Sequence, residues 1–591
     1  MKALSYAVAA VLAAAAPVFA TEYPITEDSK PHEGVPKGEK LSFVFANSKI
    51  FPGTTRNVTV YVPKQYDPAK PACVWVNQDG MQNHADVVFD NLIAKNEMPV
   101  TIYIAASPGV VKAIDGKTAL DRFNRSREYD GLGDAFARFV LEELLPFVET
   151  KTTSDGRPIK LSKNGNDRCI GGSSSGAVCA FTAAWERPAE FRRVFSTIGT
   201  YVGLQGADVY PTLIRKYEPK GLRVFLQDGD HDQNIYGGDW WMANQMMERA
   251  LAFAGYEVNH AWGTEGHNAK QGDQIFPDAV RWIWKDWPKE PQVGKNGNQF
   301  LNDILIPGEG WEVVKEKVLR DTLVAAAPNG AVTIQSGIKQ SSIGPDGKEL
   351  PPEKDAPYTS ALAFGPEAKG YALDLVHSVI SVGAEGKKIP LRNKAIFGDL
   401  VVLPEGSIYL TASTEFSSPA EFGGSPVWRL SPNGELTASD NAVGRSDERG
   451  LRKPSGIVVS PDHSLLYVAD SVGQFVYSYQ IQPDGSLKNR QPYFHLHLPD
   501  DENGSRAGGM CVDTAGRLYV ATKLGLQVCD QAGRVNCILP TPNGVSTEVT
   551  FGGANFDTLY VAAGDTIYRR KVKAKGAPAF AAPSKPAAPH L

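Results

Sequence analysis

The run Gly172–Gly176, which reads Gly-Ser-Ser-Ser-Gly, is the segment of this chain whose residue types most directly allow chemistry. A short apolar stretch over 168–171 precedes it, and an alanine-rich run over 177–185 follows it. A strand, the pattern G-x-S-x-G and a helix form a nucleophile elbow, which lifts a serine hydroxyl to the N-terminus of a helix. Glycines suit this turn because larger side chains would clash there. The pattern also fits an ordinary glycine- and serine-rich loop, so the interpretation of Ser174 as a nucleophile depends on its partners.

A serine nucleophile needs a base and a carboxylate that orients the base, and with this elbow the chain order is serine, acid, histidine. The apolar strand expected over 222–226 runs into the segment 227–232, which holds three aspartates. Acids at the carboxyl end of a parallel strand lie where the active sites of open α/β sheets lie. We predict Asp232, the deepest in the loop, as the acid. Asp230 is the alternative, and Asp228, nearest the strand, could be structural.

A histidine occupies the third position of this order. A helix is predicted over about 240–254, and an extended piece over 256–262 leads into the loop 263–268, which contains His267. The glycines of this loop suit a backbone that passes close to a partner. We therefore predict that His267 is the base that takes the proton of Ser174. The alternative is a solvated loop histidine.

Three aromatic residues, Tyr236, Trp240 and Trp241, lie just after the aspartates. Aromatic rings combine a large apolar face with specific packing geometry. We predict that these residues form a platform for a sugar or for an aromatic acyl group of the substrate. For at least one of them, core packing at the start of the helix is the alternative.

The segment from about 47 to 287 resembles the putative esterases of the enterochelin esterase and feruloyl/acetylxylan esterase group. The pieces that carry the resemblance are Val74–Gly80, Arg127–Tyr129, Glu142–Pro146, Gly171–Gly176, Asp228–Asp232 and Glu265–His267. The resemblance implies an α/β-hydrolase fold, with Asp232 as the acid and His267 as the base. It also implies an oxyanion hole made by the backbone N–H of Ser175 and by an N–H of the loop 79–81, which we assign to Met81.

The second half of the chain repeats one motif, a turn that contains glycine followed by a short strand. The motif recurs at intervals of roughly 40 to 60 residues, the range of propeller blades. Its occurrences are 328–332, 365–373, 404–410, 461–468, 515–520 and 557–561. Radial stacking of such units buries their faces and hides their strand edges. We predict an all-β six-bladed propeller; a β-sandwich with extra strands is the alternative.

This half is similar to the gluconolactonase and senescence marker protein family of propellers, most clearly over 454–462, 467–471 and 508–513. The family binds one divalent metal ion through Glu, Asn and Asp side chains. Here Ser455 stands where the family has the asparagine and Gly508 where it has an aspartate. A serine hydroxyl is a poor ligand for a hard cation and glycine offers no side-chain ligand.

Because of these two departures from the family pattern, we expect no metal ion in the propeller. Asp399 and Asp470 remain as remnants of such a site or as ordinary turn aspartates. We expect the propeller to have a structural, substrate-presenting or glycan-binding role.

The chain divides into five predicted parts. Residues 1–20 contain a lysine after Met1 and then an apolar stretch that ends at Ala20. They are predicted to be a secretory signal peptide that is cleaved after Ala20. The α/β-hydrolase esterase domain is predicted over 41–288, a linker over 289–319, the propeller over 320–572 and a disordered tail over 573–591. We expect a secreted or periplasmic protein with no membrane span after cleavage of the signal.

Composition limits the partners and the covalent framework. The formal net charge is −5 and no basic stripe occurs, so we expect no nucleic-acid partner. Six cysteines in 591 residues are too few for a fold that depends on disulfides. A hairpin centred between Cys529 and Cys537 would not place them face to face, which argues against that disulfide. A pairing of Cys73 with Cys169 stays open.

Together, these residues predict a secreted serine carboxylic ester hydrolase that needs no cofactor. Acyl esters of polysaccharides, feruloyl or acetyl, are the expected substrates, and the mechanism forms an acyl-enzyme. One alternative is a metal-dependent lactonase in the propeller. Others are a siderophore esterase and a non-catalytic glycan-binding protein.

Overall fold

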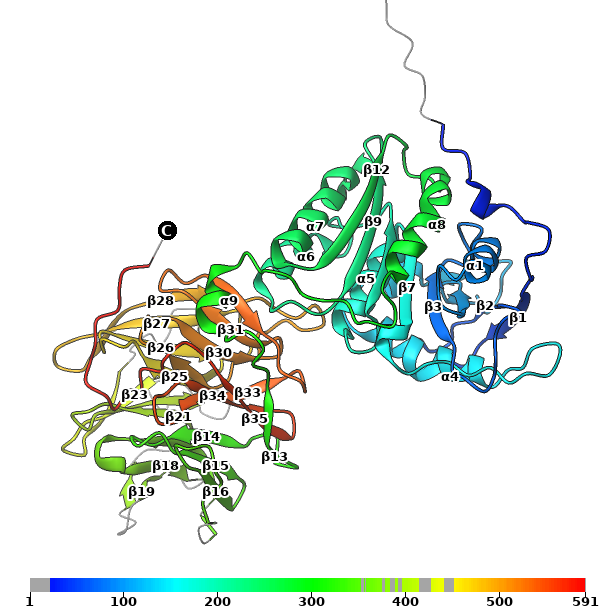
Figure 1. The fold of residues 1–591 in the computed structure, drawn as a ribbon. Coiled ribbons are helices and arrows are strands. Elements are labelled where there is room, and N and C mark those ends of the chain that lie inside the picture. Colours follow the sequence, from blue (N-terminus) through cyan, green and yellow to red (C-terminus); the bar gives the residue numbers. More distant parts are fainter. Residues whose placement is uncertain are drawn as a thin grey trace, which may run out of the picture.

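A computed structural model describes residues 22–351, 355–356, 358–374, 378–382, 388–391, 396–413, 427–439 and 451–589. The predicted signal peptide lies outside these residues. The described part of the chain contains no helix with the length and apolarity needed to cross a bilayer. An α/β domain and a ring of small β-sheets lie next to each other, and α6 (Tyr210–Lys216) and α9 (Gln299–Ile304) both contact a strand of that ring (Figure 1).

The N-terminal domain is built on one eight-stranded sheet of order β1-β2-β4-β3-β7-β8-β9-β12. Its strands are β1 (Glu39–Phe45), β2 (Arg56–Val62), β3 (Cys73–Gln78), β4 (Thr101–Ala106), β7 (Arg168–Ser173), β8 (Arg193–Thr197), β9 (Arg223–Gly229) and β12 (Glu257–Gly263). β2 pairs antiparallel with β1 and β4, and the other neighbours pair in parallel. The parallel strands in the middle are buried throughout, as expected for a sheet covered by helices on both faces.

Helices cover the two faces of this sheet. One face carries α1 (Ala85–Ala94) and α8 (Lys270–Trp284), and the other carries α5 (Ser175–Glu186), α6 and α7 (Trp240–Ala254) (Figure 1). Shorter elements complete the domain: β5 (Val110–Val111), β6 (Arg122–Phe123), α2 (Arg125–Tyr129), α3 (Ala135–Arg138), α4 (Leu145–Glu149), β10 (Asn234–Ile235) and β11 (Gly238–Asp239). Because the strands are parallel, the loops that follow β3, β7, β8, β9 and β12 meet at one edge of the sheet.

A buried ion pair ties β2 to α2. The Arg56 guanidinium donates two hydrogen bonds of 2.8 and 3.0 Å to Glu128, and both side chains are fully buried. We expect Glu128→Ala to lower the free energy of unfolding of this domain by about 3–5 kcal/mol, because it leaves the Arg56 charge buried without a partner. Urea unfolding followed by tryptophan fluorescence measures this.

The matched control for Glu128 is Glu142→Ala, which removes one partner of the exposed pair of Arg138 and Glu142. Exposed pairs contribute about 0–1 kcal/mol, so the control should stay close to the unchanged protein. Equal effects of the two substitutions would contradict a stabilising role of the buried pair.

The propeller domain consists, within the described residues, of one three-stranded and five four-stranded sheets. The first five sheets are β14–β16 (Leu323–Ala326, Val332–Ser336, Lys339–Ile343), β17–β20 (Thr359–Phe364, Gly370–Asp374, Ser378–Val382, Lys388–Pro390), β21–β24 (Ile396–Val402, Ile408–Ser413, Val427–Leu430, Leu436–Ala438), β25–β28 (Pro454–Val459, Leu465–Asp470, Phe475–Ile481, Leu487–His495) and β29–β32 (Met510–Val512, Leu518–Thr522, Gly525–Cys529, Val535–Leu539). The first strands β14, β17, β21, β25, β29 and β33 contact one another in this order, and β33 contacts β14. The sheets therefore form a closed ring.

The last sheet joins two distant parts of the chain. It contains β33 (Ser546–Gly552), β34 (Thr558–Ala563) and β35 (Thr566–Lys571), and its outer strand is β13 (Glu312–Glu316). This corrects the linker predicted over 289–319, since that segment holds both α9 and β13. The pairing of β13 with β35 fixes the end of the ring to its beginning.

The segment after β35 is ordered where the composition predicts disorder. The N–H of Lys573 donates to the Ile304 carbonyl, and the N–H of Ala577 donates to the Val512 carbonyl. Further along, Ser584 donates its N–H to the Pro461 carbonyl. These backbone hydrogen bonds hold a proline- and alanine-rich segment against the sheets, which composition alone could not reveal.

All six cysteines are free thiols. Cys529 lies opposite Val535, and Cys537 lies opposite Val528. The two cysteines of this hairpin therefore do not face each other, as the sequence predicted. Cys73 and Cys169 lie on neighbouring strands but in offset register, because Cys169 pairs with Trp75.

Candidate active site

Ser174 lies in the turn between β7 and α5, at φ 58° and ψ −124°. A positive φ strains any residue with a Cβ atom, and such strain is typical of a nucleophile elbow. A Cβ at Gly172 would lie 2.6 Å from backbone atoms of Gly176, and a Cβ at Gly176 would lie 3.1 Å from the Gln78 side chain. Close packing therefore requires a glycine at 172 and favours one at 176.

A chain of two hydrogen bonds joins the three residues that the sequence order predicts. His267 Nε2 lies 2.8 Å from Ser174 Oγ, and His267 Nδ1 lies 2.7 Å from Asp232 Oδ1. The three residues come from the loops after β12, β7 and β9, which meet at the same edge of the sheet. The geometry is the one in which an imidazole can accept the serine proton while a carboxylate fixes its tautomer.

Close crossing of two loops makes this arrangement possible. A Cβ at Gly229, the last residue of β9, would lie 2.0 Å from the carbonyl oxygen of Glu265. The absence of a side chain there lets the loop that carries Asp232 pass directly against the loop that carries His267. A glycine at this position thus contributes to the distance between acid and base.

The three candidate aspartates have distinct environments. Asp232 is buried; burial alone would raise its pKa, but its hydrogen bonds with His267, Asp228 and Gln233 together hold the pKa below the usual value. Asp230 is partly exposed and lies 2.7 Å from Nδ1 of His231. Asp228 is fully buried behind Asp232. The structure thus brings Asp232, and not the alternative Asp230, to His267.

The two residues predicted to form the oxyanion hole lie on different elements, Ser175 on α5 and Met81 in a turn. Ser175 opens α5, where the first backbone N–H groups have no partner within the helix. Met81 lies in the turn after β3 and lines a hollow with Gln82 and Asp273. In the same turn, Asp79 accepts two hydrogen bonds of 2.9 and 2.8 Å from Arg125 of α2.

Sequence reasoning missed Thr200, which belongs to the loop after β8. Its hydroxyl lies 3.3 Å from Ser174 Oγ and accepts a 3.2 Å hydrogen bond from Trp240 Nε1. No motif marks a lone threonine, and only the fold brings it to the serine. The Arg125–Asp79 pair was missed for the same reason.

The three aromatic residues predicted to bind substrate differ in exposure. Trp240 is 3% exposed, and its ring meets that of His267 edge to face at 6.0 Å, so it supports the imidazole instead of offering a free surface. Trp241 packs edge to face against Trp262 at 5.4 Å. Tyr236 is 94% exposed at the turn between β10 and β11. The platform prediction is therefore wrong for Trp240, which is a core residue at the start of α7.

Comparison with known proteins matches each half of the chain to a different family. Residues 48–300 match the family model described as putative esterase, and residues 360–565 match the one described as SMP-30/Gluconolactonase/LRE-like region. The chain joins an esterase-family domain to a gluconolactonase-like propeller domain.

Curated relatives match the gluconolactonase-like half. The gluconolactonase of Zymomonas mobilis is 25% identical over 261 residues, which are 41% of this chain and 65% of that protein. Regucalcin of Danio rerio is 32% identical over 116 residues, which are 18% of this chain and 36% of that protein. The chain thus spans less than two thirds of the length of these relatives.

Solved structures match both halves. An enterobactin esterase from Shigella flexneri is 19% identical with a TM-score of 0.33 and covers 42% of this chain and 61% of its own. A ferulic acid esterase is 17% identical with a TM-score of 0.33 and covers 42% and 98%. A gluconolactonase from Xanthomonas campestris is 20% identical with a TM-score of 0.38 and covers 46% and 92%.

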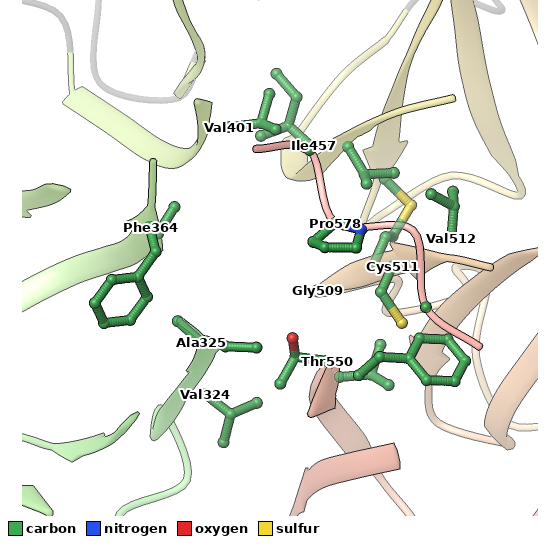
Figure 2. A pocket seen from close by; sticks show the side chains of 18 of the residues that line it. Val324, Ala325, Phe364, Val401, Ile457, Gly509, Cys511, Val512, Thr550 and Pro578 are labelled. Atoms are coloured by element: carbon green, nitrogen blue, oxygen red, sulfur yellow. The ribbon is translucent and has the colours of Figure 1, made fainter. Parts of the chain in front are cut away.

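A cavity lies at the centre of the gluconolactonase-like domain and is lined by all six first strands of the ring. Figure 2 shows Val324, Phe364, Val401 and Ile457 around it, with Pro578 of the C-terminal segment at the same cavity. The segment after β35 therefore contributes to the wall of the channel.

The channel residues do not fit the metal site that the resemblance implies. The Ser455 hydroxyl donates a 2.7 Å hydrogen bond to the Ala507 carbonyl, and a Cβ at Gly508 would lie 2.2 Å from the Thr547 carbonyl oxygen. Backbone of the next sheet therefore fills the space that an aspartate would need at Gly508. Asp399 lies within β21, and its carboxylate accepts hydrogen bonds from the backbone N–H groups of Leu400 and of Ile457 on β25.

Asp470, the other remnant considered, also binds backbone. It accepts hydrogen bonds from the N–H groups of Arg452, Lys453 and Val472. Within the described residues, no group of three or more His, Cys, Asp or Glu side chains is arranged to hold a metal ion. We derive no reaction step through a cation.

Proposed function

We propose that the protein is a serine carboxylic ester hydrolase that works through an acyl-enzyme. The observation that carries the proposal is the hydrogen-bonded chain from Ser174 through His267 to Asp232, with distances of 2.8 and 2.7 Å. In this mechanism His267 Nε2 takes the proton of Ser174 as the oxygen attacks the ester carbonyl. Asp232 holds Nδ1 protonated, and His267 then gives the proton to the leaving alcohol. Water, activated by the same imidazole, releases the acid.

The oxyanion that forms in both steps needs donors. We assign them to the backbone N–H of Ser175, at the positive end of α5, and to that of Met81 in the turn after β3. Loss of one such donor raises the barrier by roughly 3–4 kcal/mol in serine hydrolases.

The architecture that we infer for the two halves is an α/β-hydrolase followed by a six-bladed β-propeller. The elbow after β7, the antiparallel β2 and the acid and histidine after β9 and β12 support the first assignment. The closed contact between six first strands, with β13 completing the last sheet, supports the second.

Acyl esters of polysaccharides are the substrate class that we propose, in a secreted or periplasmic protein. The exposed ring of Tyr236 beside the acid loop supports an aromatic or sugar-binding surface. We expect Tyr236→Ala to raise KM for methyl ferulate several-fold with little change in kcat, since the ring touches substrate away from the reacting carbonyl. Steady-state kinetics with methyl ferulate and ethyl acetate tests this, and equal KM changes for both esters would contradict a ring-specific contact.

A lactonase in the propeller is the second candidate, because a curated gluconolactonase matches this half. The two candidates differ in their response to chelation. We expect EDTA to leave hydrolysis of p-nitrophenyl acetate unchanged, because the proposed triad uses only side chains. Activity that disappears with EDTA and returns with a divalent cation would show that hydrolysis depends on a metal site and not on the proposed triad.

A fluorophosphonate probe tests the proposed function directly. Such probes react with serines that an adjacent base activates. We expect mass spectrometry to place the label on the peptide that contains Ser174, and a panel of acetylated xylan, methyl ferulate and a catecholate siderophore to identify the ester. A protein that stays unlabelled and hydrolyses none of these esters would refute the proposal.

A further inference from the structure

A second carboxyl group, that of Asp228, lies directly behind the acid of the triad. Asp228 is fully buried near the end of β9. One of its oxygens accepts a 2.8 Å hydrogen bond from the N–H of Gly229, and the other accepts a 2.8 Å hydrogen bond from the side-chain amide of Asn244 on α7. The side chains of Asp228 and Asp232 are within hydrogen-bonding contact of each other. Neighbouring carboxyls in one buried site are seldom both ionised.

The hydrogen bonds of Asp232 are unevenly shared between its oxygens. Oδ1 accepts from His267 Nδ1 at 2.7 Å and from the N–H of Gln233 at 2.6 Å. Oδ2 is buried and, within the described residues, receives no hydrogen bond when both carboxyls are treated as ionised. A buried carboxylate oxygen without a donor is unfavourable, because it has lost its hydrogen bonds to water and gained none in return. A proton on Asp228 would supply the missing donor.

We infer that Asp228 carries a proton, donates it to Oδ2 of Asp232 and so positions the acid of the triad. The inference rests on the proposed serine mechanism for its catalytic meaning. The proton lies between the two carboxyl groups, the negative charge stays on Asp232, and Oδ1 faces His267. Asp228 does not touch substrate and is a positioning residue.

The electrostatics of the site agree with this arrangement. Burial, followed by the hydrogen bond and the charge of Asp232, raises the pKa of Asp228 to about 9. The groups that face Asp228 are Asp232 from its own loop, with His267 beyond it, and the neutral amide of Asn244 from α7. The hydrogen bonds from the Gly229 N–H and from the Asn244 amide act in the opposite direction, but they do not offset the effect of burial and of Asp232.

Two substitutions separate a proton donor from a packing residue. Asp228→Asn keeps the shape and an N–H donor and is neutral at every pH, whereas Asp228→Ala removes the donor. We expect Asp228→Asn to retain kcat within about threefold and Asp228→Ala to lower kcat roughly 10- to 100-fold with KM unchanged, by analogy with the loss of residues that support metal ligands. p-Nitrophenyl acetate is the substrate.

The pH profile provides a readout that packing would not change. Above its pKa, wild-type Asp228 loses the proton and kcat/KM should fall, because two adjacent negative charges disturb the hydrogen bond to His267. Asp228→Asn cannot ionise, so this alkaline limb should disappear. An Asp228→Asn variant that keeps the limb, or that is as slow as Asp228→Ala, would overturn the inference.

A measurement without substrate keeps this test independent of the proposed function. The proton between His267 Nδ1 and Asp232 gives a far-downfield proton NMR signal, which should persist in Asp228→Asn and shift or broaden in Asp228→Ala. An unchanged signal in Asp228→Ala overturns the positioning role whether or not any ester is hydrolysed. If no ester is hydrolysed and the signals behave as expected, the proposed reaction fails while the role of Asp228 stands. Should Asp228→Ala not fold, the alkaline limb of Asp228→Asn decides.

Discussion

Ser174→Ala is expected to lower kcat for p-nitrophenyl acetate by roughly 10⁴-fold or more, because loss of one member of a serine triad removes most of its catalysis. The hydroxyl oxygen is the atom that would bond to the acyl group, and His267 Nε2 lies 2.8 Å from it. Alanine and serine have the same difficulty in adopting φ 58°, so the backbone of the turn should not change. Initial rates at saturating ester, with the thermal unfolding midpoint as a check of folding, measure the effect.

The adjacent Ser173 offers a matched control. Its hydroxyl bonds to Gln82 and Thr197, at 3.1 and 2.7 Å, whereas His267 bonds to Ser174 and Asp232. We expect Ser173→Ala to keep kcat within about tenfold, since it removes a supporting hydrogen bond and no reacting atom. Wild-type turnover by Ser174→Ala would refute the proposed mechanism. Loss of activity only in Ser173→Ala would identify Ser173 as the nucleophile.

The sequence predicted those parts of the site that short patterns and chain order define. Ser174 stands between two glycines, and Asp232 and His267 follow β9 and β12, so each signal is local. Parallel strand ends then bring these local signals to one edge of the sheet. The propeller prediction also came from a local signal, the motif of a turn and a strand that repeats along the chain.

Contacts between distant segments could not be read in this way. Thr200 reaches Ser174 from another loop, and Arg125 reaches Asp79 from α2. Trp240 was predicted to bind substrate because it follows the acid loop, with core packing at the helix start as the alternative, and the packing of its ring beside His267 buries it.

The ordered segment after β35 and the pairing of β13 depend on partners hundreds of residues away or on backbone hydrogen bonds that no side chain encodes. The N–H of Ala577, for example, finds the carbonyl of Val512 irrespective of the alanine side chain. Composition therefore predicted disorder where tertiary contacts impose order.

Asp232→Asn is expected to lower kcat by about 10⁴-fold while the structure of the site is retained. An asparagine at this position can donate its side-chain N–H to Nδ1 of His267, which turns the imidazole into the tautomer with a proton on Nε2. That nitrogen lies 2.8 Å from Ser174 Oγ and could then no longer accept the serine proton. Burial strengthens the effect, because water cannot easily replace the lost carboxylate at a side chain that is fully buried beside His267.

The control is Asp230→Asn, two residues away in the same loop, which removes a partly exposed carboxylate that contacts His231. We expect its kcat/KM to stay within about threefold of wild type, as for most surface charges. The comparison separates the field of a nearby negative charge, which both substitutions reduce, from the direct hydrogen bond to His267, which only Asp232 makes. Equal losses in the two variants would mean that general electrostatics, and not the tautomer, governs the reaction.

A large loss in Asp230→Asn alone would identify Asp230 as the acid of the triad. Fluorophosphonate labelling rates at Ser174 in both variants report nucleophile activation without any choice of ester, so the result does not depend on which substrate the protein prefers.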